Sequence, residues 1–551
     1  MRVYVEFMAV YSLRQQLTIS GVMRVGRFSV LLSIVLLFTP LQFHAQAVQA
    51  PVVQINTNRM KADIQFMSSD ELQGRKTLSP QSRIVGRWIA SEFMRYGVKP
   101  VGNSYFQHFA VTSYIPDGGH SGLQIETRQN GSTVIRDFSP ASSGSPADDI
   151  KTKVSGPVAF AGFGISAPEY RYDDFAGLDA RGKVLLVFDY EPAEGRADSP
   201  FKGTWNTRYA YRLYRQQIAK EKGAIGLLII EGGSRRHAPP AKPDEDRLHR
   251  GPDFPVQYLA ALDPIPTRWI SEDEANEILK PSGKTASELR SEIDSTLKSQ
   301  SFLLNGVTAQ IRIASHDRET LDGRNVVGLL EGSDPKLKNE YVVVSAHYDH
   351  LGTQDGRIFH GADDNASGVA GMLEVMRTYE ENKIRPKRSI LFVAFGAEED
   401  LMVGSLGFVN SPPVPLKDIV ADVNADMIGR DEDTYRTKAE ENRNSLNIVG
   451  TLYSPDVRAA AENANLSIGL TLDYKMDRDD SENMFGRSDQ YSFAMKGIPE
   501  VLFMTGFHPD YHTSRDTWDK LNYPKMTKIT HLMFLTSLEL ADAAHRPKWV
   551  Q

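Results

Sequence analysis

Five short clusters of carboxylate and imidazole side chains lie between residues 347 and 512. Such groups bind divalent cations through oxygen and nitrogen. In chain order the clusters are His347-Tyr348-Asp349-His350, Gly361-Ala362-Asp363-Asp364-Asn365-Ala366-Ser367-Gly368, Glu398-Glu399-Asp400, Asn424-Ala425-Asp426-Met427 and Tyr511-His512-Thr513-Ser514. They lie at the ends of apolar runs, which predicts a hydrolytic site built around two metal ions.

Charge favours two ions over one. The acidic side chains that would meet in one cleft are Asp349, Asp364, Glu398, Glu399 and Asp426. Crowded carboxylates escape mutual repulsion only by binding protons or cations. One divalent ion leaves three of the five charges uncompensated (five minus two), whereas two ions leave one (five minus four).

Spacing suggests separate roles within the clusters. His347 and Asp349 are two residues apart, so both face the same side of an extended chain, and Asp349 can orient the imidazole. Glu398 and Glu399 are adjacent, so one can bind metal while the other acts as a general base. Taken singly, each cluster could instead be a solvated surface pair, a helix cap or a calcium loop. The alternating acidic spacing of an EF-hand is absent from residues 361–368.

The composition narrows the chemistry further. The chain has no cysteine, which excludes thiolate catalysis, disulfides and cysteine-bound zinc. A net charge of -7 shows no basic surplus, so no nucleic-acid partner is expected.

The elements that must hold these clusters alternate between strand and helix. Apolar runs at residues 341–345, 389–395, 418–424 and 500–504 predict strands, each just before a cluster. Residues 368–380, 405–410, 454–464 and 524–545 predict helices. The alternation predicts an α/β fold with a mixed, largely parallel sheet and helices on both faces. Sites of such folds lie at the carboxyl ends of the strands.

A chain of 551 residues is too long for one hydrophobic core. Residues 52–150, with helices at 60–67 and 82–96, and residues 305–546 are expected to form one catalytic domain, interrupted by a second domain at 154–302. That middle region predicts strands at 158–164, 183–188 and 224–230 and a helix at 209–222. His237 and His249 fall in its Pro-rich loop and are expected to be solvated.

The N-terminus is typical of an export signal. Arg24 and Arg27 precede an apolar run at residues 28–38, and Ala45-Gln46-Ala47 supplies a small-x-small cleavage pattern. We expect residues 1–47 to be removed, with Met23 as a possible true start, and the protein to be periplasmic or extracellular. An uncleaved anchor is the alternative.

The ordered motifs His347-x-Asp349, Gly361-Ala362-Asp363-Asp364, Glu398-Glu399, Asp426 and His512 closely resemble those of one family. It is the co-catalytic di-zinc peptidase family, which includes bacterial leucyl-type aminopeptidases, aminopeptidase Y and glutamate carboxypeptidase II. The resemblance implies two Zn²⁺ per chain and the zinc aminopeptidase fold.

Carried over to this chain, the resemblance implies that Asp364 bridges the two ions. His347 and Asp426 would complete one zinc site, and Glu399 and His512 the other. The implied catalytic residues are Glu398 as the general base, Asp349 as the partner of His347, and Tyr511 as a stabiliser of the oxyanion. His350, Asp363 and Asp400 are left with structural roles.

The middle region resembles a protease-associated α+β domain, through Phe160-Ala161-Gly162-Phe163-Gly164-Ile165, Tyr172-Asp173-Asp174-Phe175 and Gly182-Lys183-Val184. One departure from the family is Ser488-Asp489-Gln490, where relatives often have His at the third position. It is not a ligand position, so we expect an effect on the pocket wall at most.

The expected function is that of a secreted zinc aminopeptidase that attacks peptides through a metal-bridging hydroxide. A carboxypeptidase or dipeptidase of the same family would need cations for a substrate carboxylate, and Arg430, Arg478 and Arg487 are candidates. A glutaminyl cyclase, normally with one zinc, is a third possibility. An inactive binding protein, as in the transferrin-receptor branch, is disfavoured because every ligand is present.

Overall fold

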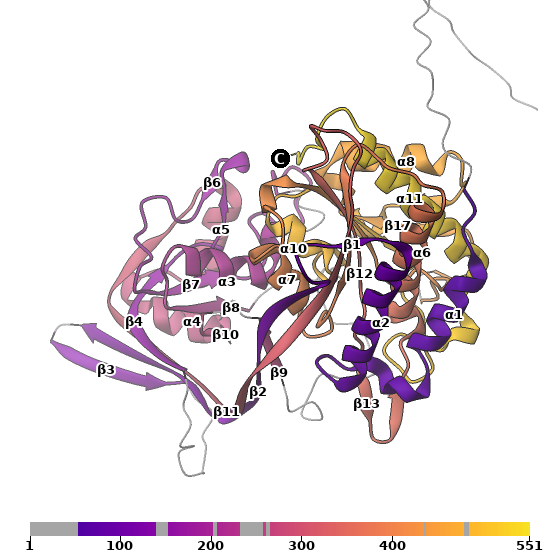
Figure 1. Ribbon diagram of the computed structural model, residues 1–551. Helices are drawn as coiled ribbons and strands as arrows, with labels where there is room; N and C mark the ends of the chain where they lie inside the picture. The colour runs from indigo at the N-terminus through magenta and orange to yellow at the C-terminus, as the bar shows by residue number, and fades with distance from the viewer. Residues whose placement is uncertain are drawn as a thin grey trace, which may run out of the picture. The chain divides into compact units, whose positions relative to one another are not determined.

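The strands that end at the predicted ligands lie side by side in one sheet of the computed structural model (Figure 1). The structure describes residues 53–129, 131–138, 152–201, 207–231, 257–260, 265–434, 437–478 and 484–550. The predicted export signal, His237 and His249 lie outside the described residues.

The half of the sheet nearest the site follows the order β11-β15-β12-β16-β19-β17-β18. The strands are β11 (Phe302–Leu330), β12 (Tyr341–His347), β15 (Ser389–Phe395), β16 (Ile419–Ala425), β17 (Ser445–Val449), β18 (Thr471–Asp473) and β19 (Glu500–Met504). Strands β15, β12, β16 and β19 are parallel, and β11 and β17 flank them in the antiparallel direction. The predicted mixed sheet with a parallel centre is confirmed.

Helices cover both faces of these strands, as predicted. One face carries α1 (Thr57–Met67), α2 (Pro80–Tyr96), α6 (Gly368–Glu381), α8 (Pro455–Asn465) and α11 (Tyr523–Asp542). The other carries α7 (Val403–Asn410) and α10 (Gln490–Met495). In Figure 1 the first group lies to the right of the strands and the second to the left. Both faces are therefore covered, which explains why every residue of β15, β16 and β19 is buried and most of them are apolar.

Strand β12 shows how one apolar run serves two cores. Val342 and Val344 pack against the core under α6 and α11, whereas Val343 packs against the core under α7. Side chains alternate between the faces of a strand, so consecutive valines reach opposite layers. His347 is the last residue of the strand and lies at its carboxyl end.

The N-terminal helices start and stop where local chemistry predicts. The Asn56 side chain accepts from the backbone N–H groups of Asn58 and Arg59 at the start of α1. Ser79 caps α2 ahead of Pro80, and Gly97 ends that helix with a φ of 84°.

The middle region has its own hydrophobic clusters. Its strands β4 (Thr152–Phe160), β7 (Val184–Phe188), β8 (Gly226–Ile230) and β10 (Thr267–Ile270) are parallel, and β4 pairs with β11 in the antiparallel direction. Its helices are α3 (Arg212–Glu221), α4 (Glu272–Leu279) and α5 (Ala286–Thr296). The helix expected at 209–222 begins at Arg212, after a short 3-10 turn at Arg208–Ala210. The proposed domain boundaries stay predictions.

Further strands extend or flank the sheet. Strand β2 (Phe106–Gln129) runs antiparallel along β11, and β1 (Lys99–Pro100), β3 (Ser132–Asp137) and β9 (Gln257–Ala260) attach to β2 or β11. Two small hairpins, β5 (Ser166–Ala167) with β6 (Tyr172–Asp173) and β13 (Gly352–Gln354) with β14 (Arg357–Phe359), and the short α9 (Lys475–Arg478), complete the elements. Within the described ranges, no helix is both long and apolar enough to cross a membrane.

Candidate metal centre

The parallel strands deliver the predicted residues to one edge of the sheet. His347 ends β12, and Asp426 directly follows β16. Glu398 and Glu399 follow the neighbouring β15, and His347 lies opposite Phe395 in the register between β12 and β15. His512 lies in the loop after β19. These five residues come together because the carboxyl ends of the parallel strands β12, β15, β16 and β19 lie at the same side of the sheet.

Asp364 reaches the same edge from an irregular turn, Ala362–Ser367, just before α6. The backbone N–H groups of Asp363 and Asp364 both donate to the carboxylate of Asp516, at 3.0 and 3.1 Å. Gly361 begins the turn with a φ of 58°, and a Cβ there would lie 2.2 Å from the carbonyl oxygen of Asp364. A glycine is therefore required at this position.

The two oxygens of Asp364 face two different histidines. Oδ1 lies 3.3 Å from Nε2 of His347, and Oδ2 lies 3.0 Å from Nε2 of His512. Asp364 is 4% exposed, so its charge is almost fully withdrawn from water. A carboxylate in this position can share one oxygen with each of two cations.

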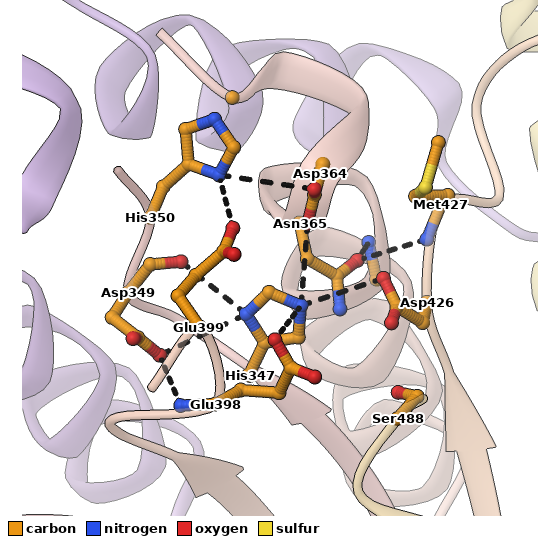
Figure 2. A network of polar contacts seen from close by, with 12 residues as sticks. His347, Asp349, His350, Asp364, Asn365, Glu398, Glu399, Asp426, Met427 and Ser488 are labelled. Atoms are coloured by element: carbon orange, nitrogen blue, oxygen red, sulfur yellow. Dashed lines mark hydrogen bonds and ion pairs between the residues drawn. The ribbon is translucent and has the colours of Figure 1, made fainter. Parts of the chain in front are cut away.

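The first group of potential ligands is His347, Asp364 and Asp426. Nε2 of His347 lies 3.4 Å from Oδ1 of Asp426. A dashed line joins the two side chains in Figure 2. Both atoms are buried, and neither makes a hydrogen bond within the described part of the chain. Buried polar atoms without hydrogen bonds are rare, and this pair fits a divalent cation between them.

The second group joins Glu399 and Asp364 to two histidines. His512 Nε2 lies 3.5 Å from Oε2 of Glu399. His350 Nδ1 lies 2.8 Å from Oε1 of the same carboxylate and 3.9 Å from Oδ2 of Asp364 (Figure 2). His350 belongs to a metal-capable group with Asp364 and Glu399, although sequence reasoning gave it a structural role.

Glu398 faces the first group. Its Oε2 lies 3.8 Å from Nε2 of His347. Burial raises the pKa of the Glu398 carboxyl well above its ordinary value, and the charge of Glu399 raises it further despite nearby His347. Burial lowers the pKa of His350 to about 4, so this imidazole is neutral at physiological pH. His350 therefore adds no positive charge to the carboxylates beside it.

Asp349 is buried between three neighbours. Its Oδ2 accepts from the Thr77 hydroxyl at 2.5 Å, and its Oδ1 accepts from the backbone N–H of Glu398 at 3.1 Å. Its Oδ1 also lies 3.7 Å from Nδ1 of His347. The nearer acceptor for that ring nitrogen is the backbone carbonyl of Asp349, at 3.3 Å. Asp349 thus contacts the backbone of the predicted base as well as the predicted ligand.

Arg75 supports the site through several hydrogen bonds, and its role was not predicted from the sequence. Its guanidinium is fully buried and donates to the carbonyl oxygens of Tyr348 (2.9 Å) and Gly361 (2.8 Å). It also donates to the carbonyl oxygens of Met67, His360 and Asp364. One cation thereby ties the end of β12 to the turn that carries Asp364. Arg75 lies in the short stretch between α1 and α2, and its position in the sequence does not relate it to the five clusters.

Tyr511 stacks on His512 with ring centroids 3.8 Å apart. Its hydroxyl accepts from Arg487 at 3.3 Å, and burial raises its pKa above the ordinary value. Among the other arginines considered for a substrate carboxylate, Arg430 binds Asp510 at 3.1 Å. The side chain of Arg478 lies outside the described part of the structure.

The residues with predicted structural roles have partners of their own. Asp363 accepts from the backbone N–H of Gly429 at 2.6 Å and lies 3.2 Å from His508. In the segment that departs from the family pattern, Gln490 donates to the carbonyl oxygen of Phe485, and burial raises the pKa of Asp489 to about 7.

Comparison with known proteins finds one family whose pattern matches the part of the chain that contains these residues. Residues 325–537, which include all eight predicted site residues, match peptidase family M28. The chain is 26% identical over 251 residues to aminopeptidase YwaD of Bacillus subtilis (strain 168), covering 44% of this chain and 50% of that protein. It is 27% identical over 405 residues to transferrin receptor protein 2 of Homo sapiens, and this match covers 67% of this chain and 46% of that protein. The matched part thus spans about half the length of these relatives.

Among solved structures, the chain is similar to an aminopeptidase from Aneurinibacillus sp. strain AM-1. The two are 20% identical, and the match covers 90% of this chain and 96% of that one with a TM-score of 0.43.

Proposed function

We propose, from the peptidase family M28 domain that residues 325–537 form, that this protein is an exported aminopeptidase that works with two zinc ions. The observation that carries the proposal is the position of Asp364 between His347 and His512, with one carboxylate oxygen toward each. His347 and Asp426 would hold one ion, and Glu399 and His512 the other.

The chemistry follows from these positions. When bound, two zinc ions would polarise the scissile carbonyl and lower the pKa of the attacking water. Glu398 lies beside the first group, with its Oε2 no closer than 3.8 Å to Nε2 of His347. Its carboxylate could therefore accept a proton from that water and deliver it to the leaving amine. Asp349 holds the backbone N–H of Glu398 and keeps the base in place.

Charge supports a substrate with a free α-amine. The five carboxylates of the cluster keep one net negative charge after two divalent cations are counted (five minus four). A substrate ammonium near the second group would offset that charge. This argument favours cleavage from the N-terminus of a peptide.

A second candidate, a dipeptidase or carboxypeptidase, is supported by Arg487. Its guanidinium donates to the hydroxyl of Tyr511, which stacks on the predicted ligand His512. A substrate carboxylate could bind such a cation in a bidentate manner. The hydrolysis panel described next distinguishes an aminopeptidase from a dipeptidase or carboxypeptidase.

The test is a hydrolysis panel with the zinc-loaded full chain. Aminoacyl p-nitroanilides would be compared with N-acetylated and C-blocked dipeptides. We expect cleavage of substrates with a free α-amine and none after N-acetylation, because acetylation removes the charge that the site would bind. Glu398→Gln should keep its zinc but lower kcat by about 10²- to 10⁴-fold.

Asp400→Asn is the matched control, since it removes a neighbouring carboxyl that we assign no role in the chemistry. It should retain most of the activity. Cleavage that survives N-acetylation would contradict the aminopeptidase proposal, and a single zinc per chain would favour a cyclase-type site instead.

Two further parts of the proposal concern the rest of the chain. We propose that residues 1–47 are a cleaved export signal, as the sequence indicates, and that residues 154–302 are a protease-associated domain, which its separate hydrophobic clusters support. N-terminal sequencing of exported protein should begin at Val48, and a start at Met1 or Met23 would contradict cleavage.

A further inference from the structure

His350 ends the segment that begins with His347, and it contacts the acidic pair that follows β15. Its Nδ1 lies 2.8 Å from Oε1 of Glu399, and both side chains are buried. His512 faces the other oxygen, Oε2, at 3.5 Å. The two histidines therefore address different oxygens of one carboxylate, as Figure 2 shows for His350 and Glu399.

The distances separate a hydrogen bond from a metal ligand. Ligand atoms around a tetrahedral zinc ion with bonds of about 2.0 Å lie roughly 3.3 Å apart. The distances from His512 to Asp364 Oδ2 (3.0 Å) and to Glu399 Oε2 (3.5 Å) bracket that spacing. The 2.8 Å contact of His350 is shorter and has the length of a charge-assisted hydrogen bond. Its Nδ1 is also 3.9 Å from Asp364 Oδ2.

The ring of His350 has little freedom to turn. Its backbone N–H donates to the carbonyl oxygen of Arg75 at 3.2 Å. On the other side, a Cβ at Gly361 would lie 2.5 Å from Cδ2 of the imidazole. The ring is thus packed between the turn that carries Asp364 and the carboxylate of Glu399.

The same segment also holds the first member of the acidic pair. Asp349 Oδ1 accepts from the backbone N–H of Glu398 at 3.1 Å, next to the contact between His350 and Glu399. One residue fixes the backbone of Glu398, and the next fixes the side chain of Glu399. The adjacent glutamates are therefore held apart by two adjacent residues.

We infer that His350 is a positioning residue that donates from Nδ1 to Oε1 of Glu399, so that only Oε2 is presented to the second ion. This inference rests on the proposed two-zinc function. It explains how two adjacent, chemically equivalent glutamates take different roles. The hydrogen bond to His350 holds Glu399 with its other oxygen toward His512, whereas Glu398 faces His347.

The test measures zinc binding rather than activity alone. The two zinc dissociation constants of the full chain would be measured by competition with a chromophoric chelator in wild type, His350→Ala, His350→Asn and His350→Gln. An Asn amide can place its N–H near the position of Nδ1, whereas the longer Gln places it near Nε2. His545→Ala, at an exposed position far along the chain, is the matched control.

Loss of the Nδ1 donor of His350 should raise the dissociation constant of one of the two zinc ions by about 10- to 100-fold. This is the usual effect of removing a residue that hydrogen-bonds to a metal ligand. We expect this loss in His350→Ala and His350→Gln, substantial recovery in His350→Asn, and no change in His545→Ala. The other zinc constant should stay close to wild type in every variant. The Asn and Gln pair keeps the comparison decisive if the alanine variant folds poorly.

Two results would overturn the inference. Unchanged zinc constants in both His350→Ala and His350→Gln would show that the contact does not position Glu399. Equal loss in His350→Asn and His350→Gln, with an altered visible spectrum of the cobalt-substituted protein, would show direct ligation by the imidazole. Failure of the proposed function is distinct, since the wild type itself would then bind fewer than two zinc ions or cleave no free-amine substrate.

Discussion

Asp349 shows how single contacts hold the candidate site. The carboxylate is fully buried, and its oxygens are satisfied by the Thr77 hydroxyl and the backbone N–H of Glu398. Thr77 precedes the middle region, whereas Asp349 follows it, and 272 positions separate them. A buried charged oxygen that loses its donor keeps the full cost of desolvation.

Thr77→Val should therefore lower the free energy of unfolding by about 1–3 kcal/mol and reduce kcat, because Asp349 would no longer be held beside Glu398. Urea unfolding and hydrolysis of an aminoacyl p-nitroanilide measure the two effects. Thr77→Ser keeps the hydroxyl and should restore both. Equal damage in the two variants would mean that the methyl group of Thr77, rather than its hydrogen bond, matters.

At the scale of elements, the turn Ala362–Ser367 depends on contacts from distant segments. Arg75 donates to carbonyl oxygens on both sides of the site, and Asn365 Nδ2 donates to the carbonyl oxygen of Ala425 at 2.9 Å. These contacts fasten the turn to the ends of β12 and β16. The turn is therefore held both by the segment that contains Arg75 and by the end of β16.

Arg75→Met should lower the free energy of unfolding by on the order of 3 kcal/mol, because several buried carbonyl oxygens lose a charged donor at once. It should also weaken zinc binding, since the turn with Asp364 and the end of β12 would no longer be joined. Arg87→Met removes an exposed arginine and should change stability by less than about 0.5 kcal/mol. Similar stability of the two variants would show that other contacts hold the turn.

For the molecule as a whole, strand β11 links the two halves of the sheet, because it pairs with β4 on one side and β15 on the other. The middle region contains a buried acid, Asp174, which accepts from the backbone N–H of Phe163 and from the Tyr172 hydroxyl. Burial raises the pKa of Asp174 from 3.8 to about 7. The folded state therefore holds a proton that the unfolded chain releases.

This raised pKa fixes the sign of a pH effect. The stability that proton binding contributes is fully present below the unfolded pKa of 3.8 and is lost as pH rises through about 7. Asp174→Asn has no such proton to lose. Urea unfolding from about pH 4 to pH 8 should show wild type losing stability relative to Asp174→Asn as pH rises. A constant difference across that range would contradict the raised pKa.

Much of the architecture could be predicted from local pattern. The strands predicted at residues 389–395 and 500–504 agree with β15 and β19, because a strand covered on both faces is recognisable by a continuous run of mostly apolar residues. The long β2 and β11 were not predicted, since both contain polar residues and irregular register shifts that hide the alternation.

The sequence by itself determined the types of side chain at the candidate site and their place at strand ends, because carboxylates and imidazoles after apolar runs have few other uses in such numbers. Only the tertiary structure decided which oxygen of Asp364 faces which histidine, and that His350 contacts Glu399. It also revealed Arg75, whose carbonyl partner at Asp364 lies 289 positions away. Contacts across such separations leave no periodic pattern in the chain, because they are fixed by packing and not by local spacing.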